Sequence, residues 1–322
     1  MKIKQMVASV GILVLAALCV ARADDTFPSR QISLIVPNAP GGGMDTVARL
    51  LGKKLSEALS QPIIVENRPG GAENIGINAG AKAAPDGYTL LLSSNSITIN
   101  PSLFKHLNYD ASKDLLPIGK VTSLPMLIVC SPSAPYKTLF EFIAYAKGNP
   151  GKLSYGSPGT GTPHHLAMEL LKSAAGIDIL HVPYKGTAPG LTDLLGDTIP
   201  LLVTTVAPVA AYLQSGQLRI LATLSPTRLS QFPDVPAVSE YILGFGVDVW
   251  HGVFAPAGTP PAIAAKLTNV LEGVVKDPDL SAQLTRIGVV PAWAPPSELR
   301  QTIGVEQAQW AAAIKKAGIQ PQ

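Results

Sequence analysis

A short apolar segment that runs directly into three consecutive glycines constrains this chain more than any other feature. Residues 32–36 read Ile-Ser-Leu-Ile-Val and predict a buried strand, and glycines 41–43 follow before helical periodicity begins. Glycine lets the backbone turn tightly and expose its N–H groups, while a helix N-terminus carries partial positive charge. The loop from Pro37 to Asp45 contains no lysine or arginine. The pattern therefore predicts a strand–loop–helix unit that can hold an anion with backbone groups alone.

A second stretch later in the chain repeats this arrangement. Residues 153–156 predict a strand, and a loop rich in glycine, serine and threonine leads to Pro163, whose fixed φ suits the first turn of a helix. Hydroxyls of Ser157 and Thr160 add hydrogen-bond donors, and this loop also lacks lysine and arginine. Each loop alone could be an ordinary tight turn. Two of them favour two lobes around a cleft for a small molecule with two carboxylates, or with one carboxylate and another polar end.

Composition and element order place the chain among globular α/β proteins. The 322 residues are 47% hydrophobic and 15% charged, which suffices for two domains and excludes a disordered chain. Alternating strand-like and helix-like segments predict α/β domains with mostly parallel sheets. Strands are predicted at Ile32–Val36, Ile63–Glu66, Thr89–Ser93, Met126–Cys130, Leu153–Gly156, Ile179–Val182, Ile199–Thr204, Leu218–Thr223 and Val249–Ala255. The C-terminal third is predicted to be mainly helical, at Ile263–Val275, Ser281–Ile287 and Ser297–Ala317.

Residues 1–23 predict a secretory signal peptide. Two lysines precede an apolar run from Val7 to Val20, and an Ala-x-Ala motif ends at Ala23, where cleavage is expected. An uncleaved membrane anchor is the alternative, although the apolar run is short for a bilayer span. Cleavage removes three basic residues and no acidic ones, so the net charge falls from +3 to zero. A periplasmic protein is therefore expected, without the basic field that would favour nucleic acid as a partner.

The motifs of cofactor, metal and catalytic sites are weak or missing in this sequence. Neither glycine loop carries the lysine of a triphosphate-binding loop or the spacing of a dinucleotide fingerprint, so no cofactor is predicted. Cys130 is the one cysteine left after cleavage, and the adjacent His164 and His165 diverge on a helix, so no metal site is predicted. A hydrolase with Ser157 as nucleophile and His164 or His251 as base is an alternative function, although the first glycine of a nucleophile elbow is missing.

Polar residues at the carboxyl ends of predicted strands are candidate ligand contacts. In open α/β sheets, ligands bind in the crevice beyond these strand ends. Ser94 and Asn95 directly follow one predicted strand, and Thr204 and Thr205 end another. We expect these four residues to face the cleft.

Three further residues each have a structural and a functional interpretation. Asp45 could cap the helix that follows the first loop, or it could hold a water molecule against the ligand. His251 lies on a predicted strand that could cross between the lobes, where a hinge position and a ligand contact are equally compatible with the sequence. Lys185 could cover the surface or supply a cation at the mouth of the cleft.

Several stretches, in the same order along nearly the whole mature chain, resemble the solute-binding proteins of the tripartite tricarboxylate transporter family, also called Bug proteins. The matching stretches are Ile35–Asp45, Val65–Gly70, Ala84–Leu90, Asn100–Leu103, Asn149–Ser157, His181–Gly186, Thr192–Gly196, Pro233–Pro236 and Ala255–Pro260. Single matches of this length would be weak, but this many in order are highly specific.

This resemblance implies a periplasmic-binding fold of the type in which the chain crosses twice between two lobes. We expect one lobe from residues 24–125 and 250–322, the other from residues 126–249, and the ligand cleft between them. The resemblance also implies capture of a small organic acid and its delivery to membrane permease subunits, with citrate, dicarboxylates, amino acids and aromatic acids as typical ligands. We expect a mono- or dicarboxylate, aromatic ones included, and a monomer that makes and breaks no bond. A ligand sensor that works through a membrane kinase is a further alternative.

The expected ligand contacts combine the chemistry of the loops with the positions that the family uses. They are Ala39, Gly41, Gly42, Asp45, Ser94, Asn95, Ser157, Gly159, Thr160, Thr204, Thr205 and His251. Some positions depart from the usual family pattern: Asn38 and His251 stand where aromatic residues are common, Gly43-Met44 replaces Ser-Thr, and Thr204-Thr205 replaces Asp-Asn. Loss of a carboxylate and gain of an imidazole would suit a more acidic or an aromatic acid.

Overall fold

The computed structural model describes residues 27–321. Its described strands are β1 (Ile32–Val36), β2 (Ile63–Asn67), β3 (Thr89–Ser94), β4 (Leu115–Cys130), β5 (Ser154–Ser157), β6 (Leu180–Pro183), β7 (Leu201–Thr205), β8 (Arg219–Thr223), β9 (Asp248–Pro256) and β10 (Val290–Ala294). Its described α-helices are α2 (Gly43–Leu59), α3 (Asn74–Ala81), α4 (Ser96–Leu103), α5 (Ala111–Asp114), α6 (Leu139–Gly148), α7 (Pro163–Ala175), α8 (Thr187–Leu195), α9 (Ala210–Gln214), α10 (Pro261–Val275), α11 (Pro278–Arg286) and α12 (Pro296–Lys316). The predicted signal peptide and its cleavage after Ala23 lie outside the described residues.

The strands form one mixed sheet in the order β2-β1-β3-β9-β4-β7-β5-β6, and β10 and β8 also pair with β4. The pairs of β1 with β2 and β3, and of β5 with β6 and β7, are parallel, as the alternation of strands and helices predicts. The central strands β4 and β9 run antiparallel to their neighbours. The α/β fold class is therefore confirmed, with an antiparallel centre that joins two parallel ends.

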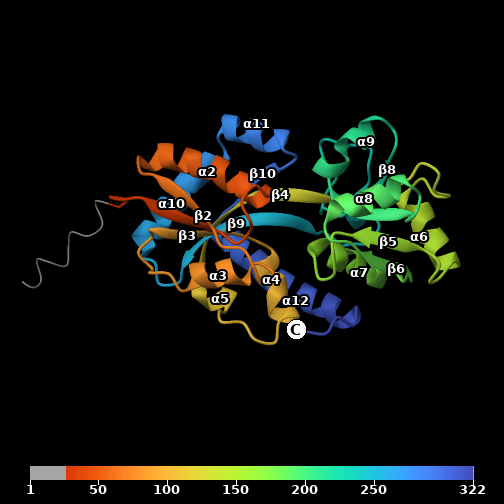
Figure 1. Cartoon of the computed structure of the whole chain (residues 1–322), viewed down its shortest axis with the longest axis horizontal. Coiled ribbons are helices and arrows are strands. Elements are labelled where there is room, and N and C mark those ends of the chain that lie inside the picture. Colours follow the sequence, from red (N-terminus) through yellow and green to blue (C-terminus); the bar gives the residue numbers. More distant parts are fainter. Residues whose placement is uncertain (1–26, 322) are drawn as a thin grey trace, which may run out of the picture.

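Strand β4 connects these two ends (Figure 1). Its first part, Leu115–Pro125, pairs with β9, and its last part, Met126–Cys130, pairs with β7. The sequence predicted only this last part as strand. The register shifts between Pro117 and Gly119, so a bulge accommodates residues that normally interrupt strands. Strand β10 was also missed, because Pro291 makes an edge strand look like a connection between helices.

Helices cover both faces of the strand group formed by β1, β2, β3, β9, β10 and the first part of β4. Helices α2, α10 and α11 pack their apolar residues on one face, and α3, α4 and α12 pack on the other (Figure 1). In α2, the buried residues Val47, Leu51, Leu55 and Leu59 recur at helical spacing. This packing fixes the helix directly behind the first glycine loop.

A second hydrophobic core surrounds β5, β7, β8 and the last part of β4. Cys130 is a buried free cysteine in this core, as expected for a small apolar residue. Helix α12 reaches this core as well, since Trp310 and Ile314 belong to it and α12 contacts α7. The lobe boundaries predicted from the sequence stay a prediction, because the sheet and α12 both link the two cores.

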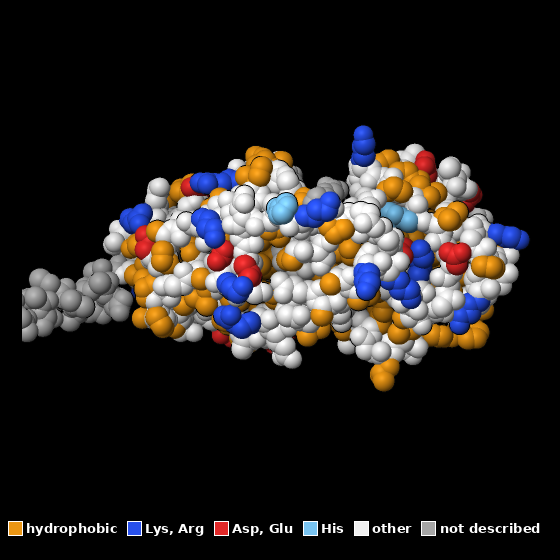
Figure 2. All heavy atoms as spheres, turned by 90° about the horizontal axis from the view of Figure 1, so that it is seen from below, with side chains coloured by type: hydrophobic (Ala, Val, Ile, Leu, Met, Phe, Trp, Pro, Cys, Tyr) orange, Lys and Arg blue, Asp and Glu red, His pale blue; other side chains and the backbone are white. Residues whose placement is uncertain are grey.

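The surface seen in Figure 2 carries Lys and Arg side chains interspersed with Asp and Glu, so this face presents no extended field of one charge. Within residues 27–321, no helix combines the length and hydrophobicity that a membrane span requires. The same residues contain no group of three or more His, Cys, Asp or Glu that could hold a metal ion.

Candidate functional site

Four helix N-termini meet at one cavity of about 390 Å³. Residues at the start of α2, α3, α4 and α7, or directly before these helices, contribute to its wall. The lining residues are Asn38, Gly43, Met44, Ala72, Glu73, Ser94, Asn95, Ser96, Ile99, Asn100, Leu103, Leu124, Pro158, Thr160, Gly161, Thr162, Pro163, His164, Val249 and His251. The first N–H groups of a helix have no acceptor within the helix, so a helix N-terminus carries partial positive charge. Some of these N–H groups are bonded outside their helix: that of Asn74 donates to the Gly71 carbonyl, and that of His165 donates to Thr162 Oγ1.

The wall of this cavity has two chemical characters. It contains no lysine or arginine, so a bound anion would depend on helix N-termini and neutral donors. Ile99, Leu103 and Leu124 add an apolar surface that can cover a hydrocarbon or aromatic body. The cavity therefore suits a small molecule with an anionic end and an apolar part.

Asp45 holds the first glycine loop in place through hydrogen bonds. Its Oδ2 accepts hydrogen bonds from the Gly41 N–H and the Arg49 Nε–H, both at 2.9 Å, and its Oδ1 accepts one from Asn67 Nδ2 at 2.9 Å. The hydrogen bond from Arg49 is the main reason why the pKa of Asp45 falls to about 2. Asp45 is buried and does not line the cavity, so its visible role is to hold the loop in shape.

The N-terminus of α4 brings Ser94 and Asn95 to the cavity from the end of β3. Ser94 Oγ donates to the carboxylate of Glu73, with distances of 3.0 and 3.2 Å to its two oxygens, and accepts from the Ser96 N–H. Asn95 Nδ2 donates to the carbonyl of Asp248 at 3.2 Å, which ties this turn to β9. In the described structure, the Oδ1 atom of Asn95 is buried without a hydrogen-bond partner, although Asn95 lines the cavity.

Two histidines contribute neutral rings to the wall. His251 Nδ1 lies 2.9 Å from Thr122 Oγ1, its partner residue on β4, and burial lowers the pKa of His251 to about 4. Burial also lowers the pKa of His164 to about 4, and within residues 27–321 its Nδ1 has no hydrogen-bond partner. Both rings are uncharged near neutral pH and can donate or accept according to tautomer.

The second glycine loop rests on hydroxyls and a histidine pair. Ser157 Oγ lies 2.7 Å from His181 Nε2, and the ring of His181 stacks on that of His165 at a centroid distance of 3.8 Å. Thr162 Oγ1 donates to the Gly159 carbonyl at 2.7 Å. Ser157 is completely buried and contacts His181, not His164 or His251, so the geometry required by the alternative hydrolase is not formed.

The structure brings four of the twelve predicted contacts to the cavity wall: Ser94, Asn95, Thr160 and His251. Ala39, Gly41, Gly42, Asp45, Ser157 and Gly159 belong to the two loops but do not line the cavity. Thr204 and Thr205 also lie outside the lining; Thr204 is buried and its Oγ1 donates to the Thr205 carbonyl at 3.2 Å. Lys185 is exposed and does not line the cavity. The binding role of these residues stays a prediction.

Glu73 is the sole acidic residue of the cavity lining, and the sequence did not predict it as a contact. The sole available signal was its position just after β2, a strand parallel to β1 in the same sheet. Since the carboxyl ends of parallel strands share one edge of a sheet, a polar residue in the loop after β2 is a candidate ligand contact on the same grounds as Ser94.

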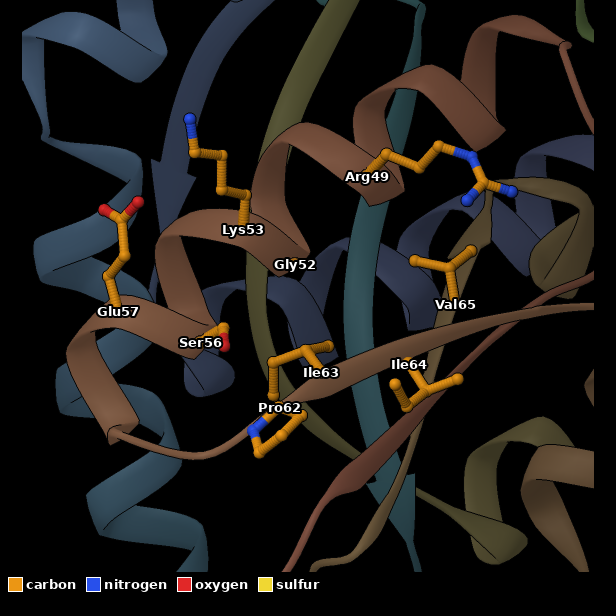
Figure 3. Close-up of a pocket in the computed structure, with 9 residues that line it drawn as sticks. All are labelled: Arg49, Gly52, Lys53, Ser56, Glu57, Pro62, Ile63, Ile64 and Val65. Carbon is orange, nitrogen blue, oxygen red and sulfur yellow. The ribbon is translucent and has the colours of Figure 1, made fainter.

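A larger depression of about 640 Å³ lies on the outer side of α2 and β2. Figure 3 shows Arg49, Lys53 and Glu57 along α2, with Ile63 and Ile64 on the adjacent segment. This depression has no helix N-terminus and none of the predicted contacts in its wall. Size alone therefore does not identify the site, and the smaller cavity at the four helix N-termini is the candidate.

An α/β fold with a cavity free of lysine and arginine at converging helix N-termini is typical of small-molecule binding proteins. The family model described as "Tripartite tricarboxylate transporter family receptor" matches residues 47–319. The chain belongs to this family, and the resemblance predicted from the sequence is confirmed.

Curated relatives cover almost the whole chain. A UPF0065 protein of Bordetella pertussis is 37% identical over 319 residues, which are 98% of this chain and 97% of the relative. The protein BugT of the same organism is 35% identical over 324 residues, 99% of each chain.

Solved structures give the same result for the fold. A TctC solute-binding protein from Polaromonas has a TM-score of 0.83 at 31% identity and covers 90% of this chain and 100% of its own. An R. palustris protein solved with adipate has a TM-score of 0.75 at 32% identity, over 92% of this chain and 100% of its own. MatC from Rhodopseudomonas palustris, solved with malate, has a TM-score of 0.70 at 31% identity, over 89% and 100%. These neighbours are solute-binding proteins, and two of them hold small carboxylates.

Proposed function

We propose that this chain captures a small organic carboxylate in the periplasm and delivers it to the membrane subunits of a tripartite tricarboxylate-type transporter. The observation that carries the proposal is the convergence of four helix N-termini on one cavity without lysine or arginine in its wall. Backbone N–H groups and helix dipoles stabilise an anion there. The adipate and malate held by two structural neighbours support a carboxylate as the ligand.

The remaining parts of the proposal concern how the protein works. The signal peptide at residues 1–23 would export the chain, and cleavage would release it as a monomer. Lobes formed by residues 24–125 with 250–322, and by residues 126–249, would close around the ligand by a hinge motion. The ligand would be carried and released unchanged, so the protein would act as a receptor and not as an enzyme.

A thermal-unfolding screen with mono-, di- and tricarboxylates, including aromatic ones, tests the proposal. A ligand at 100 times its dissociation constant stabilises the folded state by about 2.7 kcal/mol, which raises the melting temperature measurably. If no carboxylate raises the melting temperature while sugars or cations do, the proposal is wrong.

The variant Gly43→Asp tests whether the helix N-termini bind the anion. A Cβ at Gly43 meets no atom within 4 Å, so the side chain fits, and an aspartate in the first turn of α2 is favourable for the helix. Because Gly43 lines the cavity, the added charge would lie at its wall, and we expect carboxylate affinity to fall at least tenfold, about 1.4 kcal/mol, by calorimetric titration.

Gly304→Asp is the matched control. Gly304 is exposed on α12 and also has open space at its Cβ position, but it does not line the cavity. It should leave carboxylate affinity unchanged. Equal affinities in the wild type and in Gly43→Asp would contradict an anion site at α2.

A further inference from the structure

The turn that carries Glu73 has an unusual backbone. Ala72 has a φ of 52° and Glu73 a φ of 76°, both in the left-handed region that residues other than glycine rarely adopt. Glu73 is the N-cap of α3, yet its side chain makes no capping hydrogen bond. Its carboxylate instead reaches Ser94 across the cavity wall. Local helix capping therefore does not explain why a long acidic side chain stands at this strained position.

Glu73 also has an unusual electrostatic environment. It is the sole carboxylate in the cavity wall, and no lysine or arginine lines the wall to neutralise it. In the described residues it forms no ion pair; its neighbours are the hydroxyls of Ser94 and Ser96 and the amide of Asn38, whose nitrogen can face Glu73 Oε1 at 3.3 Å. Burial raises the pKa of Glu73 to about 7. An ionised Glu73 would repel a purely anionic ligand in the same cavity.

A second acceptor lies in the same wall. Asn95 is fully buried, its amide nitrogen is used by the Asp248 carbonyl, and its Oδ1 has no partner in the described structure. A buried acceptor without a donor is costly, and a ligand that supplies N–H groups would satisfy it. Glu73 and Asn95, both of which offer an oxygen acceptor, line the same cavity, whose helix ends attract an anion.

We propose that Glu73 is a specificity-determining residue that binds the ammonium group of a zwitterionic organic acid. The carboxylate of such a ligand would be held by the helix N-termini, and its ammonium group would face Glu73 and Asn95. The inference rests on the proposed function and deepens it, because it selects amino-bearing acids from the general class of carboxylates. A plain acid of the same skeleton would leave Glu73 without a counter-charge.

Matched ligand pairs test the inference by calorimetric titration. L-phenylalanine and 3-phenylpropionate share one skeleton and differ in the ammonium group, as do L-aspartate and succinate. In at least one pair we expect the wild type to bind the amino acid tenfold or more tightly than the plain acid. Glu73→Gln should abolish that preference, while Glu57→Gln on the exposed side of α2 should keep it.

Glu73→Gly separates ligand binding from folding. Glycine tolerates a φ of 76°, so this variant should melt at or above the wild-type temperature and yet lose the preference. A preference that survives both Glu73→Gln and Glu73→Gly would overturn the inference.

The pH dependence gives an independent readout. Binding of an ammonium group favours ionised Glu73, so amino acid affinity should rise between pH 6 and 8 with release of protons. A plain acid should bind more weakly as the pH rises, because it favours the protonated form. The other titratable groups near Glu73 do not interfere, since the pKa values of His164 and His251 are about 4 and that of Tyr109 is about 12.

The outcomes distinguish the two proposals. If plain acids bind as tightly as amino acids or more tightly, the role of Glu73 is wrong and the carboxylate receptor remains. If neither member of either pair nor any other organic acid binds, both proposals are wrong.

Discussion

The two glycine loops are alike in sequence, since both are rich in glycine and lack lysine and arginine, but different kinds of side chain hold them in place. The first loop is held by a charged group, Asp45, which joins the Gly41 N–H to Arg49 and Asn67. The second is held by neutral groups, the Ser157 hydroxyl and the stacked rings of His165 and His181. Neither loop itself contains a lysine or an arginine. Glycine content predicts that a loop can expose N–H groups, but it does not predict what holds the loop in place.

This difference predicts that acid weakens the second loop before the first. Burial lowers the pKa values of His165 and His181 to about 4, below the unfolded value of about 6.5. The unfolded chain therefore takes up protons between pH 6.5 and 4 while the folded rings stay neutral. Each ring should remove up to about 1.4 kcal/mol of stability per pH unit in this window.

Urea unfolding between pH 7.5 and 4.5 measures this effect. His181→Gln should give a smaller loss of stability per pH unit than the wild type, whatever its stability at pH 7. Over the same range the first loop should keep its anchor, because the pKa of Asp45 is about 2 and its contribution is lost only as the pH falls from about 4 to 2. Identical slopes in the wild type and His181→Gln would show that the pair is not the acid-sensitive element.

The variant Asp45→Ala removes the support of the first loop. It deprives the Gly41 N–H, Arg49 and Asn67 of their common acceptor, and we expect the free energy of unfolding to fall by about 2 kcal/mol. The control is Glu272→Ala, which breaks a solvent-exposed pair with Lys276 and should cost about 0.5 kcal/mol or less. If both variants lose equally little in urea unfolding, Asp45 is not the anchor.

The sequence predicted the elements that local patterns determine. The strand at Ile32–Val36 and the helices after both glycine loops have the apolar spacing, glycines and proline that define their ends. It did not predict the full β4, because Pro117 and Gly119 are tolerated only through a bulge that its neighbours stabilise. At these two residues the pairing with neighbouring strands, and not the local sequence, determines the strand.

The candidate site was predictable to a similar degree. Ser94 and Asn95 follow from the rule that ligands bind beyond strand ends, and the structure places both at the cavity. Glu73 does not follow from it, because Glu73 lies on a left-handed turn that its own residue type does not favour. Thr204 satisfies the same rule as Ser94 but lies outside the lining, so the rule selects an edge of the sheet and not single residues.

The smallest expected effect compares one glycine from each loop. Gly41 has a φ of 80° and open space at its Cβ position, whereas Gly161 has a φ of 78° and its Cβ would lie 3.0 Å from Leu103 Cδ1. Alanine at either position is strained by about 1 kcal/mol, because the left-handed backbone disfavours a side chain. Gly161→Ala must also displace Leu103, so its loss in urea unfolding should exceed that of Gly41→Ala by a few tenths of a kcal/mol or more. If Gly161→Ala lowers the free energy of unfolding by the same amount as Gly41→Ala or by less, Leu103 does not restrict the second loop as its packing predicts.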